Sequence, residues 1–98
     1  MSIQTIWGVI DKYGRVMSGS GFSVKRDNDG EYVITFSTPF TALPAITGSQ
    51  VLYGSTGEWP SDGVVFPILS TDSATAITGG KEEDISDRTF SFIAIGPV

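Results

Sequence analysis

The stretch that most constrains the fold covers residues 21–44, with the sequence GFSVKRDNDGEYVITFSTPFTALP. Its central turn, DNDG at residues 27–30, consists of residue types that tolerate a positive φ angle. On either side of this turn apolar side chains occupy every second position: Phe22, Val24, Tyr32, Ile34 and Phe36. Alternation with a period of two around an Asp-Gly turn is the strongest short-range indication of a β-hairpin. The sequence therefore predicts an all-β protein.

Turn-forming residues continue at this rhythm along the whole chain. Twelve Gly and five Pro are spread at intervals of about 8–12 residues, which is typical of an all-β sandwich or barrel. We expect strands at residues 5–10, 15–17, 22–26, 31–37, 45–53, 64–70, 75–78 and 89–95. A chain of 98 residues is short enough for one domain, residues 1–98. The expected fold is an antiparallel β-sandwich of six to eight strands.

Two of the expected strands are apolar on both faces. In the strand at residues 64–70, Val64, Phe66 and Ile68 alternate with Val65, Pro67 and Leu69. In the last strand, Phe90, Phe92 and Ala94 alternate with Ile93 and Ile95. Each sheet of a two-layer sandwich has only one inner face, so the other apolar row favours contact with a second subunit. Enclosure of both rows within the domain is the alternative. We expect a homo-oligomer.

Charge and composition exclude several functions. The net charge is −5, so a nucleic-acid backbone would be repelled. The chain has no Cys and no His, which removes the thiolate nucleophile and the commonest general base and metal ligand. We expect no enzyme, no cofactor and no bound metal. The opening residues lack the basic and apolar regions of a signal peptide, and no apolar run is long enough for a membrane helix. A soluble chain is expected; its localisation is left open, with association with a virion and the cytoplasm as the two options.

The best candidate binding site is the polar loop at residues 54–63, GSTGEWPSDG. Its Trp59 offers a ring that can stack on the apolar face of a sugar, and neighbouring carboxylates and hydroxyls can bind sugar hydroxyl groups. The predicted contact residues are Trp59, Glu58 and Asp62, with Tyr53 beside them. The alternative is that Trp59 folds back as a lid on the edge of the core. The second tryptophan, Trp7, alternates with polar and apolar neighbours and is most simply a packing residue.

A second polar segment, residues 79–88, holds four of the eleven acidic residues. It does not have the spacing of an EF-hand calcium loop. The simpler interpretation is a solvated, charged hairpin end that keeps a sheet edge from pairing with another chain. Several other Asp residues fall at turns, where Asp bonds to its own backbone, and no pair among them stands out as a glycosidase pair.

Three segments, in their order along the chain, carry a resemblance to a known family: GEYVITF at residues 30–36, PFTALPAI at 39–46 and FSFIAIG at 90–96. They resemble the H-type lectin domain and the related β-sandwich tips of bacteriophage tail fibres. The resemblance implies a six- or seven-stranded sandwich, a homotrimer sometimes doubled to a hexamer, and sugar bound near subunit boundaries. A Trp is common in the last strand of that family, whereas this chain has Phe90 and Phe92 there. The family's polar sugar site has no position-by-position match.

Two functions therefore remain open. The first is a non-enzymatic, trimeric carbohydrate-binding or receptor-recognition module, such as a lectin or a viral fibre tip, that binds a cell-surface glycan. The second is a structural trimerisation cap or particle component with no ligand. A hydrolase is disfavoured because, without His, Asp and Glu would have to perform every proton transfer.

Overall fold

The computed structural model describes residues 1–52, 54, 56, 59–80 and 84–98. All eight expected strands are present, although their ends differ by up to three residues. Their bounds are β1 Ile3–Ile10, β2 Val16–Ser20, β3 Phe22–Asn28, β4 Glu31–Phe36, β5 Ala45–Gln50, β6 Gly63–Leu69, β7 Ser73–Gly79 and β8 Phe90–Pro97. Among the described residues there is no helix long and apolar enough to cross a membrane.

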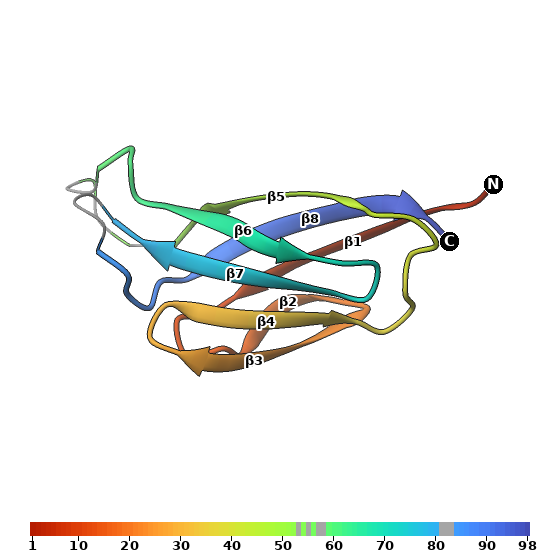
Figure 1. Ribbon diagram of the computed structural model, residues 1–98. Helices are drawn as coiled ribbons and strands as arrows, with labels where there is room; N and C mark the ends of the chain where they lie inside the picture. Colours follow the sequence, from red (N-terminus) through yellow and green to blue (C-terminus); the bar gives the residue numbers. More distant parts are fainter. Residues whose placement is uncertain (53, 55, 57–58, 81–83) are drawn as a thin grey trace.

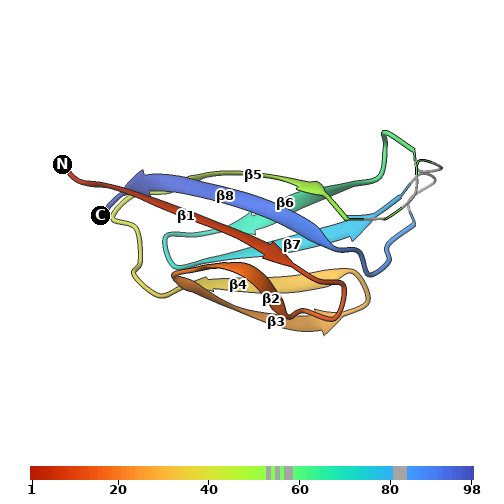
Figure 2. The same cartoon turned by 180° about the vertical axis from the view of Figure 1, so that it is seen from behind.

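The strands form two antiparallel sheets that face each other, as Figures 1 and 2 show from opposite sides. Sheet A has the strand order β2-β1-β8-β5, and sheet B has the order β3-β4-β7-β6. β1 and β8 pair along their whole length, from Ile3 opposite Pro97 to Ile10 opposite Phe90. The first and last strands thus form the centre of sheet A. The predicted antiparallel sandwich is confirmed at this level.

The predicted hairpin is the outer half of sheet B. β3 pairs with β4 from Phe22 opposite Phe36 to Asn28 opposite Glu31, with an irregularity just before the turn. Gly30 has a φ angle of 66°, a conformation that a residue with a Cβ atom rarely adopts. A Cβ atom at Gly30 would also come within 2.8 Å of the Thr78 carbonyl oxygen. The final glycine of the turn is therefore required for both its conformation and its lack of a side chain.

Aromatic side chains from the two sheets meet in the core. Phe22 of sheet B packs edge-on against Phe92 of sheet A, with 5.0 Å between ring centres. The ring centres of Tyr32 and Phe90 lie 5.2 Å apart. These contacts join the hairpin to the last strand, whose buried row is Phe90, Phe92 and Ala94.

The prediction for β6 was wrong at its far end. Pairing with β7 shifts between Val65 and Ile68, so the strand carries a bulge that contains Pro67. Pro lacks a backbone N–H and is found in sheets mainly at edges and bulges. The extra residue reverses the alternation: Ile68 is exposed, and Leu69 packs against the core with Val64 and Phe66. The outer apolar row of β6 is therefore Val65, Pro67 and Ile68.

Trp7, expected to be a packing residue, is not buried within the chain. Trp7 pairs with Ile93 of β8, and both side chains stand on the outer face of sheet A. Their exposed fractions are 51% and 50%. Period-two alternation correctly groups the residues of β1 into two rows, but the buried row contains Ile6, Gly8 and Ile10. This inward position requires a glycine because a Cβ atom at Gly8 would collide with the Phe22 ring in the core.

Candidate functional site

The connections between strands gather polar groups at one end of the sandwich, which we call the loop end. It comprises the β1–β2 turn, the β3–β4 turn, and the β5–β6 and β7–β8 connections (Figure 1). Both chain termini lie at the opposite end (Figure 1). The loop end is therefore not covered by either terminus.

Trp59 lies in a tight turn at the loop end. The backbone N–H of Asp62 donates to the carbonyl of Trp59 at 2.9 Å, and the N–H of Trp59 lies 3.3 Å from Oδ2 of Asp62. An Asp side chain that bonds to backbone near a turn is a common way to fix its geometry. Trp59 remains 57% exposed. The alternative in which it closes over the core as a lid does not describe this arrangement.

Arg88 joins this turn to the rest of the loop end. Its guanidinium lies 3.6 Å from the carboxylate of Asp62 and 3.5 Å from that of Asp84, and its Nε donates to the Ser86 hydroxyl at 3.1 Å. The same guanidinium reaches the side-chain oxygen of Gln50, at the end of β5, at 3.4 Å. The side chains of Arg88 and Asp62 are 17% and 9% exposed. Mostly buried charges are found in pairs because an unpaired one is costly.

Gln50 extends this connection to sheet B. Its Nε2 donates to the carbonyl oxygens of Gly63 at 3.0 Å and Gly79 at 2.5 Å. Those two residues face each other across β6 and β7. The turn that presents Trp59 is therefore tied to three strands.

Asp87 holds the other side of the loop end together. Its Oδ1 accepts a hydrogen bond from the backbone N–H of Gly30 at 2.7 Å, and its Oδ2 accepts one from Nε of Arg26 at 2.9 Å. The buried hydroxyl of Tyr32 lies 3.2 Å from Oδ1 and 2.8 Å from the carbonyl oxygen of Lys12. Burial alone would raise the pKa of the Asp87 carboxyl. The hydrogen bonds from Arg26, Gly30 and Tyr32 outweigh that effect and hold the pKa below its usual range.

Tyr32 has the opposite shift. Burial, and next the nearby Asp87 carboxylate, raise the pKa of its hydroxyl to about 12. This hydroxyl is therefore neutral at any physiological pH, and it serves as a donor within the fold.

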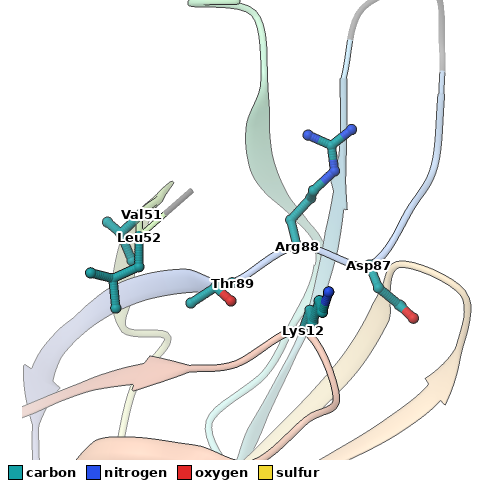
Figure 3. Close-up of a pocket in the computed structure, with 6 residues that line it drawn as sticks. All are labelled: Lys12, Val51, Leu52, Asp87, Arg88 and Thr89. Carbon is teal, nitrogen blue, oxygen red and sulfur yellow. The ribbon is translucent and has the colours of Figure 1, made fainter. Parts of the chain in front are cut away.

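A shallow cavity of about 280 Å³ lies between these two clusters. Figure 3 shows its lining residues: Lys12, Val51, Leu52, Asp87, Arg88 and Thr89. In this view Asp87 and Arg88 point to opposite sides of the chain, and Lys12 approaches from the β1–β2 turn. The cavity is lined by side chains of both charges, Lys12, Arg88 and Asp87, and by the apolar side chains of Val51 and Leu52. Such a mixture suits a polar organic ligand of small size.

The structure brings two of the four predicted contact residues together. Trp59 and Asp62 share one turn, as the shared loop predicted. Tyr53 and Glu58 lie outside the described residues. The sequence reasoning missed Lys12, Asp87 and Arg88. In the acidic segment, Asp84 and Asp87 pair with arginines, whereas Glu82 and Glu83 lie outside the described residues.

Within the described part of the chain, no cluster of three or more acidic, His or Cys side chains could hold a metal ion. Five carboxylates in the described part of the loop end each pair with an arginine: Asp11, Asp29, Asp62, Asp84 and Asp87. Their arrangement supports binding and structural roles.

Comparisons with known proteins found no matching family model, no matching curated protein and no matching solved structure.

Proposed function

We propose that this chain is a non-enzymatic recognition module that binds a carbohydrate through its loop end and works as a homo-oligomer, with a trimer as the expected form. The observation that carries the proposal is the exposed ring of Trp59, held in a fixed turn by Asp62 and Arg88. An exposed tryptophan on a rigid support loses little conformational freedom when it stacks on a ligand.

The surroundings of Trp59 favour a sugar. A pyranose has an apolar face that suits the ring and a rim of hydroxyl groups that need hydrogen-bond partners. The loop-end cavity, which is linked to the Trp59 turn through Arg88 and Asp62, offers such partners in Lys12 and Thr89, beside the apolar side chains of Val51 and Leu52. The resemblance to H-type lectins and phage fibre tips leads to the same ligand class.

An oligomer would make weak sugar binding useful. Several identical sites on one rigid assembly raise the overall avidity without any new contact. The location of both termini away from the loop end is compatible with display of the sites at the tip of a larger particle.

A glycan array followed by calorimetry with the best glycan tests the proposal. Trp59→Ala is expected to weaken binding by roughly 30-fold or more, the effect of removing an aromatic hot spot. Trp59→Tyr should retain part of the affinity because it keeps a stacking ring. The matched control is Leu43→Ala, which removes an apolar side chain of similar exposure (65%) from the β4–β5 connection; that connection lies at the opposite end of the molecule (Figure 1). Unchanged binding by Trp59→Ala would refute the assignment of the site.

The second candidate function is a structural cap or particle component with no ligand. The exposed and uncharged outer face of sheet A favours this structural function, because such a face suits contact between subunits and requires no ligand. If this second function is correct, the wild-type chain forms the oligomer but binds no glycan on the array. Calorimetry with glycans at millimolar concentration then detects no binding either.

A further inference from the structure

The outer face of sheet A carries no charged side chain among its outward residues on the four strands. These residues are Ile3, Thr5, Trp7 and Val9 of β1, Ser18 and Ser20 of β2, Ala45, Thr47 and Ser49 of β5, and Ser91, Ile93, Ile95 and Pro97 of β8. The outer face of sheet B, in contrast, includes Lys25 and Glu31. A solvated sheet face normally bears polar and charged residues in alternation with the core row.

A ridge and a hollow lie side by side on this face. Trp7 and Ile93 are paired neighbours on β1 and β8, and both are about half exposed. Next to Ile93, between β8 and β5, is a hollow of about 230 Å³. Its rim consists of Thr47, Ser49, Ser91 and Ile93, and its floor is the paired Gly48 and Phe92.

We propose that this face is the contact surface between copies of this chain, with the Trp7 ring of one copy in the Thr47–Ser91 hollow of the next. The inference rests on the homo-oligomer of the proposed function and assigns it a surface. A knob and a hole on one face make that face complementary to a second copy of itself. The hydroxyl groups on the rim offer acceptors for the indole N–H, so both the apolar ring and its polar edge are matched.

Charge also favours a second copy as the occupant. Each chain has a net charge of −5, so contact through a charged face would add like-charge repulsion at the interface, which a neutral surface avoids. The outer face of sheet A is such a surface, and it would gain nothing from a strongly charged partner.

The size of the face is adequate. Four strands of five to eight residues cover roughly 400–500 Å² in projection. The accessible area of a face with protruding side chains exceeds its projection. The projected area alone is about half of the roughly 800 Å² per partner of a standard interface.

The test compares charged substitutions on the two sheets by sedimentation equilibrium of the full chain. Ile93→Lys and Thr47→Arg, on the ridge and on the hollow, are each expected to weaken association by about 100-fold or more, because each buries an unpaired charge. Ile68→Lys is the matched control: Ile68 is an Ile of similar exposure (62%) on the outer face of sheet B, and its replacement should change association by less than about threefold. Thermal unfolding of each variant verifies that it is folded.

The outcomes separate this inference from the proposed function. If the wild type is an oligomer that Ile93→Lys and Thr47→Arg leave intact, or that Ile68→Lys alone dissociates, the surface assignment is wrong and the oligomer stands. If the wild type is a monomer, both the surface and the oligomer are wrong. Glycan binding by that monomer would still support recognition through Trp59.

Discussion

Replacement of Asp87 tests how the loop end is held together. Asp87 provides the acceptor for the buried N–H of Gly30, at 2.7 Å, and thereby joins the β7–β8 connection to the β3–β4 turn. In Asp87→Ala this N–H loses its partner and remains buried, which costs about 1–3 kcal/mol. The lost ion pair with Arg26 adds little, because both side chains are partly solvated. We expect a total loss of about 2 kcal/mol.

The assay is thermal and denaturant unfolding at one fixed protein concentration, since oligomer stability depends on concentration. A loss of about 2 kcal/mol lowers Tm by about 8–16 °C in a domain of this size. Asp87→Asn keeps an oxygen for Gly30 and should cost less. Asp84→Ala, which removes a more exposed carboxylate from the same connection, should stay within about 0.5 kcal/mol of the wild type.

The same two Asp87 variants have a predicted pH signature. The pKa of Asp87 is lowered in the folded state, so the stability that its carboxylate contributes is fully present at pH values above its ordinary pKa of 3.8. The contribution is lost as the pH falls from there through the folded-state pKa. Wild type should therefore lose stability on acidification more steeply than Asp87→Asn. Equal acid slopes, or an Asp87→Ala variant within about 0.5 kcal/mol of wild type, would refute this account of the loop end.

Two further predictions concern single interactions. Tyr32→Phe removes the donor to the Lys12 carbonyl and should cost about 1 kcal/mol in chemical unfolding. Because folding raises the pKa of Tyr32 to about 12, the contribution of its hydroxyl to stability is complete below pH 10 and disappears as the pH rises through 12. Tyr32→Phe should therefore lack this loss of stability at alkaline pH. If the variant loses stability with rising pH as steeply as wild type, the assignment is wrong. Lys25→Ala breaks only an exposed ion pair with Asp27, so its stability should stay within about 0.5 kcal/mol of wild type, and a larger loss would be inconsistent with its solvated position on β3.

The strands were predictable because their signals are local. Alternation and turn residues identify the β3–β4 hairpin, and the same signals locate the other six strands. The orientation of two strands was not predictable for a physical reason. Where both rows of a strand are apolar, period two groups the residues without indicating which row is buried. In β1 each row mixes apolar with polar or small residues, which left the face of Trp7 undetermined, and in β6 the bulge at Pro67 reversed the burial of Ile68 and Leu69.

Only the part of the candidate site that consists of residues close together in sequence could be predicted. Trp59 and Asp62 are three residues apart, and their shared turn follows from loop composition. Arg88 reaches Asp62 across the fold, from the end of a different connection. Asp87 likewise bonds to a turn 57 residues away. A single sequence contains no local signal for such long-range pairs, so these supporting residues became visible only in the structure.

The central claim, a recognition module assembled through an uncharged sheet face, is tested most directly by the mass of the chain in solution. Light scattering on a sizing column at low micromolar concentration makes this measurement. The account predicts an oligomer, with a trimer at about three times the 10.4 kDa chain mass as the expected form. A single species at 10.4 kDa would contradict it, and the exposed ridge of Trp7 and Ile93 would then lack the partner that this account assigns to it.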